Sequence, residues 1–198
     1  DRGDRAELRP QRKVFSELIF DRSVTATGKR VLTSARGDVW TLPAREGSPR
    51  NLTLTSAAAE RDPQGSPDGK WVAYFTDASG EYQLVVVSAD GRELRPLTRR
   101  DSGFLFDPVW SPDSRHIAFW DQSGTLFVAT LEGGAVVTVD RDPRGGQPRV
   151  SWSSDSRWIA YARGLEDNRF TTAIRLFDRE SGAVHQVTSG RFLDSWPT

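Results

Sequence analysis

The sequence contains no cysteine and no methionine. The lack of cysteine excludes disulfide bonds, thiolate metal sites and a cysteine nucleophile. Because methionine is missing even at position 1, we expect the gene to begin upstream of Asp1 and the chain to be a fragment. No apolar run approaches the roughly 18 residues of a membrane helix, and the polar start DRGDRAELRP is unlike a signal peptide. We therefore predict no association with a membrane.

Neither sign of charge is in excess, because 27 lysines and arginines balance 27 aspartates and glutamates. This balance creates no overall field that would attract nucleic acid, so nucleic acid is not expected as a partner. With 36% hydrophobic and 27% charged residues, the composition is typical of a folded globular protein.

A nine-residue pattern recurs along the chain. Its spacing is 45 residues from Asp68 to Asp113 and 42 residues from Asp113 to Asp155. A period of about 40–45 residues with short strands is typical of β-propeller blades. The copies are SPDGKWVAY (Ser66–Tyr74), SPDSRHIAF (Ser111–Phe119) and SSDSRWIAY (Ser153–Tyr161), with a weaker one in ATGKRVL (Ala26–Leu32).

Each repeat divides into four strand-like segments, which in the second repeat are Asp62–Ser66, Trp71–Thr76, Tyr82–Ser88 and Leu94–Thr98. β-Branched and aromatic residues fill these segments, Gly, Asp and Ser separate them, and no segment has helical periodicity. We therefore predict an all-β fold, a β-propeller of four-stranded blades with about four blades plus the start of a fifth. Both ends of the repeat array are incomplete, which favours an arc of a six- or seven-bladed ring.

The whole chain, residues 1–198, is thus predicted to be a single propeller segment. Its repeats are 18–62, 63–107, 108–148 and 149–194, and the next repeat starts at 195–198.

The recurring residues suit structural roles. Proline presets φ in the turn, and the aspartate that follows it can accept hydrogen bonds from its own backbone. We therefore assign Asp68, Asp113 and Asp155 to turns, not to catalysis. In the Val/Ile-Ala-Tyr/Phe triplet we expect one bulky residue on each face of the strand, with the small alanine allowing close sheet approach.

One position breaks the pattern, because Gly65 stands where the later repeats have Trp110 and Trp152. Losing a buried indole ordinarily costs about 3–5 kcal/mol. We therefore expect a neighbouring side chain to fill the volume beside Gly65.

Signals for chemistry are weak. His116 takes the strand position of Trp71 and Trp158, His185 lies in a fourth-strand segment, and neither is accompanied by a Gly-x-Ser-x-Gly motif. No His-x₃-His pair or calcium-type acidic loop occurs, and Gly145-Gly146 lacks the Lys-Ser/Thr of a phosphate-binding loop. The sequence thus predicts no catalytic residue, no metal site and no cofactor.

Three predicted loops, Leu54–Asp62, Arg99–Asp107 and Arg141–Pro148, join the last strand of one blade to the first of the next. They should share one face of the ring, around the mouth of its channel. Arginine can pair with a peptide carboxylate, and exposed phenylalanine can hold apolar side chains. The alternative, that these are ordinary solvated connections with ion pairs worth about 0–1 kcal/mol each, is favoured because exposed charge is usual. The candidate substrate-binding residues are Arg61, Arg99, Arg100, Phe104, Phe106, Arg141 and Arg144.

Four segments together resemble the propeller region of the tricorn proteases. They are RGDVWTLP (Arg36–Pro43), RNLT (Arg50–Thr53), ERDPQGSPDGKWVAYFTDASGEYQL (Glu60–Leu84) and DPVWSPDSRHIAF (Asp107–Phe119). The wider Trp-Ser-Pro-Asp-Gly pattern is shared with TolB and other propellers and fixes only the fold. The segment Glu60–Leu84, taken together with Arg36–Pro43, is more specific. It looks most like the second propeller of the tricorn proteases, which has seven blades. The resemblance covers roughly Leu8 onward and departs at Gly65, where the family usually has tryptophan.

The resemblance implies a large, self-compartmentalising serine protease that trims oligopeptides in the cytosol. In that family the catalytic Ser and His lie in C-terminal domains beyond a PDZ-like module, so no catalytic residue is carried over to this sequence. The implied role is a non-catalytic propeller segment in substrate gating and assembly. Its implied partners are peptides and the other domains and subunits of a homo-oligomeric, cytoplasmic parent protein.

Two other functions stay open. One is a TolB-like protein-interaction propeller without enzymatic activity, and the other is the propeller cap of a prolyl-oligopeptidase-type hydrolase. In every case we predict that this chain alone has no peptidase activity.

Overall fold

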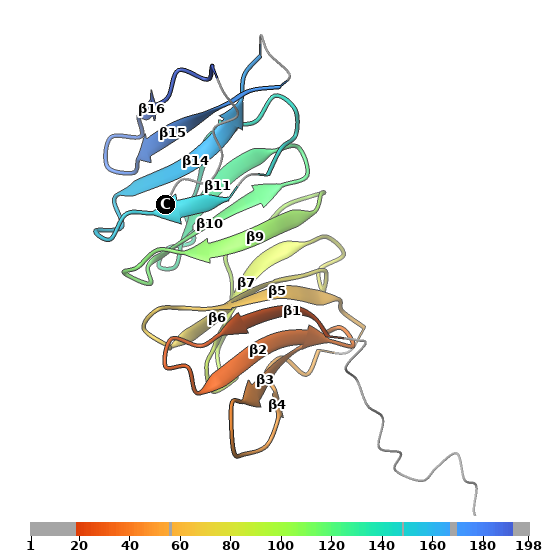
Figure 1. Cartoon of the computed structure of the whole chain (residues 1–198). Coiled ribbons are helices and arrows are strands. Elements are labelled where there is room, and N and C mark those ends of the chain that lie inside the picture. The colour runs from red at the N-terminus through yellow and green to blue at the C-terminus, as the bar shows by residue number, and fades with distance from the viewer. Residues whose placement is uncertain (1–18, 56, 148, 167–169, 192–198) are drawn as a thin grey trace, which may run out of the picture.

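The computed structural model describes residues 19–55, 57–147, 149–166 and 170–191. Throughout these residues the chain forms strands, turns and bends and no helix, so no helix suited to crossing a membrane occurs in them. The strands form four antiparallel sheets of four strands each (Figure 1). The predicted all-β arc of four propeller blades is confirmed, and the predicted start of a fifth blade lies outside the described residues.

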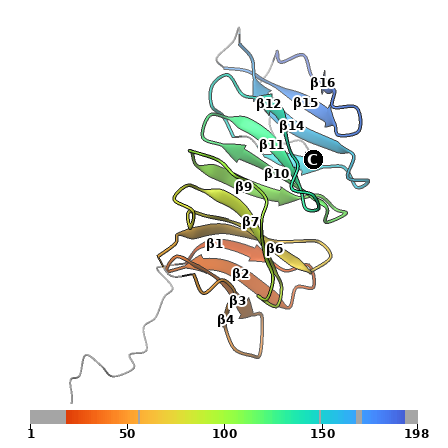
Figure 2. The ribbon, with the colours of Figure 1, turned by 180° about the vertical axis from the view of Figure 1, so that it is seen from behind.

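Each blade is a meander whose strands follow one another in chain order. The strands of the first two blades are β1 (Ile19–Val24), β2 (Arg30–Ala35), β3 (Asp38–Pro43), β4 (Arg50–Asn51), β5 (Glu60–Gly65), β6 (Trp71–Thr76), β7 (Gln83–Ser88) and β8 (Leu94–Pro96). Those of the last two are β9 (Leu105–Trp110), β10 (His116–Asp121), β11 (Thr125–Thr130), β12 (Val136–Arg141), β13 (Val150–Trp152), β14 (Trp158–Gly164), β15 (Thr172–Asp178) and β16 (Val184–Gln186). Figures 1 and 2 show the four blades stacked one after another along the chain.

The turn between the first and second strands of a blade is built as the sequence predicts. In the second blade, Asp68 Oδ1 accepts hydrogen bonds from the Lys70 N–H at 3.0 Å and from the Ser66 hydroxyl at 2.6 Å. The next residue, Gly69, has a φ of 72°, a conformation that glycine adopts without strain. The equivalent aspartates of the third and fourth blades accept the same two bonds, so all three aspartates are turn residues.

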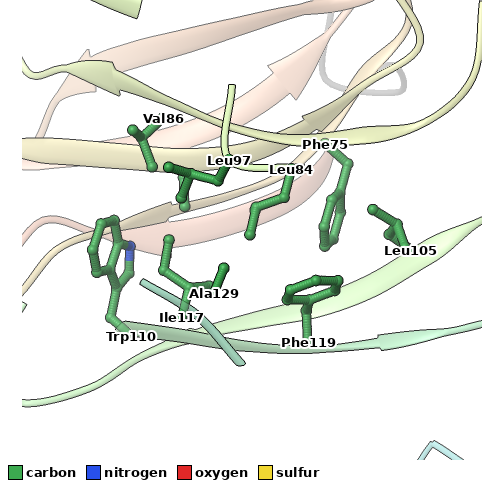
Figure 3. Packing of buried hydrophobic residues seen from close by; sticks show 10 residues of the cluster. Phe75, Leu84, Val86, Leu97, Leu105, Trp110, Ile117, Phe119 and Ala129 are labelled. Carbon is green, nitrogen blue, oxygen red and sulfur yellow. The ribbon is translucent and has the colours of Figure 1, made fainter. Parts of the chain in front are cut away.

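The faces of the second strand correct one prediction. Ile117 and Phe119 both belong to the core between the second and third blades (Figure 3). Ala118 belongs to the core between the third and fourth blades. Successive side chains of a strand point to opposite faces, so the first and third residues of the triplet must share a face. The expectation of one bulky residue on each face is therefore wrong. Both bulky residues point to the preceding blade and the alanine points to the following one.

The expected filling of the space beside Gly65 is confirmed. A Cβ atom at Gly65 would lie 3.4 Å from Leu32 Cδ1 and 3.7 Å from Thr25 Cα. Leu32 is 1% exposed and belongs to the core between the first two blades. The leucine of the first blade thus takes the place that an indole occupies in the later blades.

Each contact between neighbouring blades (a seam) after the first carries the same indole hydrogen bond. Trp110 Nε1 donates to the Gln64 carbonyl oxygen at 3.0 Å across the second seam. Trp152 Nε1 donates to the Val109 carbonyl oxygen at 3.2 Å across the third. The two acceptors occupy equivalent positions, one residue before Gly65 and Trp110 respectively.

A serine hydroxyl adds a second bond to the same two seams. The Asp68 N–H donates to Ser114 Oγ, and the Asp113 N–H donates to Ser156 Oγ, both at 3.0 Å. At the first seam Gly69 stands where these serines stand, so this bond has no counterpart there.

Candidate functional site

The connections between blades lie at the same end of the sheets as the turns between the second and third strands. The Ala59 N–H of the β4–β5 connection donates to Asp77 Oδ1, next to β6. The Gln122 N–H of the β10–β11 turn donates to the Phe104 carbonyl oxygen in the β8–β9 connection at 3.0 Å. In the β12–β13 connection, the Asp142 N–H donates to the Gly124 carbonyl oxygen at 2.8 Å. We call this end of the blades the linker face.

The connections are shorter than the predicted loops. Arg61 lies inside β5, Phe106 inside β9, and Arg141 at the end of β12. Strands β5 and β9 begin ahead of the repeat boundaries drawn from the sequence. Asp62 and Asp107, read as loop ends, instead sit in strand irregularities with φ values of 55° and 50°.

Arg61 is committed to packing. Its Nη1 lies 3.0 Å from Asp62 Oδ2, and Nη2 donates to the Leu105 carbonyl oxygen across the second seam. The guanidinium carbon also lies 4.6 Å from the ring centre of Tyr82, with three phenylalanine rings within 5.6 Å. The guanidinium of Arg61 is therefore held by protein groups on both sides of the second seam.

Arg100 is engaged in a similar way. Its Nη2 lies 2.8 Å from Asp121 Oδ2, and its guanidinium lies 4.8 Å from the ring centre of Phe127. Burial alone would raise the pKa of Asp121, but hydrogen bonds from Ser123 and Thr125, together with the charge of Arg100, hold that pKa below its usual value. The carboxylate therefore stays ionised and keeps Arg100 against the third blade.

The two phenylalanines of the candidate set have different environments. Phe104 is 50% exposed on the linker face, and its ring centre lies 5.0 Å from that of Tyr82. Phe106 is half-buried and packs against the core between the third and fourth blades. Of these two phenylalanines, Phe104 alone is exposed as the sequence analysis expected.

The other three arginines do not join this group. Arg99 is exposed in the β8–β9 connection. Arg141 and Arg144 are exposed at the seam of the third and fourth blades, where Arg144 Nη2 donates to the Thr171 carbonyl oxygen at 3.0 Å. The candidate residues are therefore divided between two seams and do not form one basic site.

A pocket of about 380 Å³ opens on the linker face between the second and third blades. Three segments form its walls: the β6–β7 loop, the β8–β9 connection and the β10–β11 turn. Its lining residues are Asp77, Gly80, Glu81, Tyr82, Ser102, Gly103, Phe104 and Gln122. Sequence reasoning named only Phe104 of this set. Asp77 and Glu81 lie in the polar loop DASGE between β6 and β7, where the sequence indicated no site.

A carboxylate pair also joins the first strands of the first two blades. The Asp62 N–H donates to Asp21 Oδ2 at 3.1 Å, and the Ser34 hydroxyl donates to the same oxygen at 2.7 Å. Burial and the nearby charge of Asp21 raise the pKa of Asp62 to about 6. Asp62 belongs to an Asp-Pro dipeptide that recurs 45 residues later at Asp107, but nothing in the sequence pairs it with Asp21.

The histidines have packing environments. His116 is 8% exposed, and its ring centre lies 6.3 Å from that of Trp152 across the third seam. Burial lowers the pKa of His116. His185 is exposed and lies 6.0 Å from the ring of Trp158, measured between centres. Within the described ranges, no group of three or more His, Asp or Glu residues is arranged to hold a metal ion.

Comparison with known proteins assigns the chain to a family. The sequence model described as the tricorn protease second beta propeller domain matches residues 19–198. The chain belongs to this family. Tricorn protease homolog 1 of Streptomyces coelicolor is 30% identical over 180 residues, which cover 87% of this chain and 16% of that relative.

Solved structures show the same fold. A crystal structure of the tricorn protease superimposes with a TM-score of 0.79 at 15% identity, covering 90% of this chain and 17% of that one. A putative TolB from Agrobacterium tumefaciens superimposes with a TM-score of 0.65 at 20% identity, covering 89% of this chain and 65% of that one. The tricorn-type propeller described here thus spans about a sixth of the tricorn proteins that it matches.

Proposed function

We propose that this chain is a non-catalytic propeller segment of a tricorn-like serine peptidase that degrades oligopeptides in the cytoplasm. Its part would be substrate gating and assembly within an arc of a six- or seven-bladed ring. The observation that carries this proposal is the family match over residues 19–198. The use of the recurring Asp, Ser and Trp residues in turns and seams supports it, because these polar groups are occupied in building the blades.

A TolB-like interaction module is the second candidate, because TolB structures share the fold. The tricorn assignment is preferred for its higher TM-score, 0.79 against 0.65, and for the family match. The downstream reading frame separates the candidates. A PDZ-like module followed by a serine hydrolase domain supports the tricorn-like peptidase, and an immediate stop codon supports the TolB-like module. A Gly-x-Ser-x-Gly α/β-hydrolase indicates a prolyl-oligopeptidase-type enzyme.

The gating role is tested by Phe104→Ala in the longer peptidase. Because Phe104 is half exposed on the linker face, its loss should lower kcat/KM for long oligopeptides and leave the cleavage of a short fluorogenic peptide unchanged. Val137→Ala is the matched control, since Val137 is equally exposed but lies on the outermost strand β12. Unchanged kinetics of the Phe104 variant for every peptide length would contradict the role.

The purified chain itself should not hydrolyse peptides. We expect no turnover of a fluorogenic oligopeptide above the buffer rate. Hydrolysis that a serine-directed inhibitor abolishes would contradict the proposed non-catalytic role.

A further inference from the structure

The linker face between the second and third blades exposes acidic and aromatic groups, although its sequence is rich in arginine. Arg61 and Arg100 are turned into the protein and paired with Asp62 and Asp121. The exposed charges of the β8–β9 connection, Arg99 and Asp101, have opposite signs.

The carboxylates of the pocket are free of such pairing. In the described part of the chain, no cationic side chain forms an ion pair with Asp77 or Glu81. Asp77 accepts one hydrogen bond, from the Ala59 N–H. The Glu81 side chain is exposed in the β6–β7 loop. The pocket therefore presents two carboxylates that have no ion-pair partner among the described residues, and a bound cation would supply one.

The aromatic wall of the pocket already contacts one planar cation, the guanidinium of Arg61. Tyr82 and Phe104 lie with their ring centres 5.0 Å apart and their planes inclined by 35°. From the protein side, the guanidinium of Arg61 already lies 4.6 Å from Tyr82 and 5.6 Å from Phe104. Aromatic faces attract cations through the ring quadrupole, so the half-exposed Phe104 offers the same interaction to a ligand.

We propose that this pocket binds the cationic side chain of a peptide, an arginine guanidinium or a lysine ammonium, between Glu81, Asp77 and the ring of Phe104. The Gln122 amide and the Ser102 hydroxyl, which also line the pocket, supply acceptors for the remaining N–H groups. That the cation belongs to a peptide rests on the proposed function, and the preference for a cation rests on the pocket alone.

The test is a titration of the ¹⁵N-labelled chain with acetyl-Ala-Arg-Ala-amide, followed by ¹H–¹⁵N NMR. We expect saturable shifts of the Gly80, Glu81, Gly103 and Gln122 amides that weaken as salt is raised. The same peptide with citrulline, which has the shape of arginine without its charge, should bind at least tenfold more weakly. Acetyl-Ala-Glu-Ala-amide should produce no saturable shifts at these amides.

Substitution of the carboxylate tests the same contact from the protein side. Glu81→Gln should weaken binding of the arginine peptide about twofold to fivefold, the range of an exposed ion pair. Glu132→Gln, an identical change on the exposed turn at the opposite end of β11, should leave the affinity unchanged.

Equal affinity for the arginine and citrulline peptides, shifts confined to other surfaces, or absence of saturable shifts would each overturn the proposal. These readouts need no peptidase activity. The two proposals can fail separately. If this chain binds the arginine peptide as expected but Phe104→Ala does not alter peptide turnover in the longer protein, the cation-binding pocket stands and the gating role is contradicted.

Discussion

Asp155 and Asp62 show how position within a blade sets the chemistry of a single residue type. In the turn of the fourth blade, the Ser153 hydroxyl and the Arg157 N–H hold the pKa of Asp155 below its usual range. On the first strand of the second blade, burial and the neighbouring Asp21 raise the pKa of Asp62 to about 6. The first aspartate therefore stays charged at neutral pH, while the second takes up a proton near pH 6.

The raised pKa of Asp62 makes stability depend on pH. The native carboxyl holds its proton up to about pH 6, whereas the unfolded one loses it near its ordinary pKa of 3.8. Between these values the native state binds more protons, so the free energy of unfolding falls as pH rises and stays lower above pH 6. Asp62→Asn removes the charge, and asparagine tolerates the φ of 55°. We compare the free energy of unfolding of this variant with that of the unsubstituted protein, measured in urea. The difference should shift in favour of the variant by about 1–2 kcal/mol between pH 4 and pH 7.5.

Asp90→Asn is the control, with the opposite sign. The Ser88 hydroxyl holds the pKa of Asp90 below its ordinary value, so this variant should lose relative stability between pH 4 and pH 7.5. The same pH trend in both variants would show that the Asp62 environment is not responsible.

The indole hydrogen bond of the third seam makes a second prediction at this scale. Trp152→Phe keeps an aromatic ring but removes the N–H that donates to the Val109 carbonyl oxygen, at a cost of about 0.5–1.5 kcal/mol in the free energy of unfolding. Trp158→Phe removes the same atoms from a position whose indole makes no seam hydrogen bond in the described structure, and should cost less. If the two variants lose the same free energy of unfolding in chemical denaturation, the smaller ring and not the hydrogen bond accounts for the effect.

At the scale of elements, the first seam is built differently from the other two. It has Gly65 and Gly69 where the later blades have tryptophan and serine, and Leu32 approaches the Gly65 backbone directly. The Ser23 hydroxyl also donates to the Pro63 carbonyl oxygen at 2.6 Å across this seam. An apolar side chain and a different hydroxyl thus replace the repeated bonds.

Leu32→Ala should therefore destabilise the protein by about 2–5 kcal/mol, because it removes the side chain that fills the first seam. Leu94→Ala, at a position 54% exposed, should change the free energy of unfolding by less than about 0.5 kcal/mol. A loss below about 1 kcal/mol for the Leu32 variant in urea denaturation would mean that the seam closes around the cavity.

The sequence predicted the blades because their signals are local and repeated: turn residues, β-branched strands and a fixed period. It also predicted that a neighbour fills the space at Gly65. It could not pair Arg61 with the Leu105 carbonyl oxygen or Arg100 with Asp121, because these partners meet only when two blades stack. For the same reason Asp77 and Glu81 gave no signal, since their pocket forms between segments of two blades.

At the scale of the whole molecule, the fourth blade ends the described arc with a face that no other described sheet packs against. Phe177 and Tyr161 pack toward the third blade, so Leu176 and Ala160, which pair across β14 and β15, point the other way. Within the described residues no sheet covers this apolar face. An apolar sheet face without a partner sheet promotes association.

We therefore expect the isolated chain to associate as its concentration rises, measured by sedimentation velocity. Leu176→Arg should shift the distribution toward monomer, because it places a charge on the uncovered face. Val137→Arg, on the exposed outer strand of the third blade, is the control and should not. A monomeric wild-type chain at every concentration would contradict the expectation.

The Trp and Ser bonds of the second and third seams have a consequence for how such a protein grows. Donor and acceptor both belong to the repeated unit. A duplicated stretch of gene therefore encodes the residues that form these hydrogen bonds with the blade before it and the blade after it. Blade number can then change in evolution without a new kind of contact between blades, whereas a copy with glycine at these two positions, as at the first seam, needs other contacts.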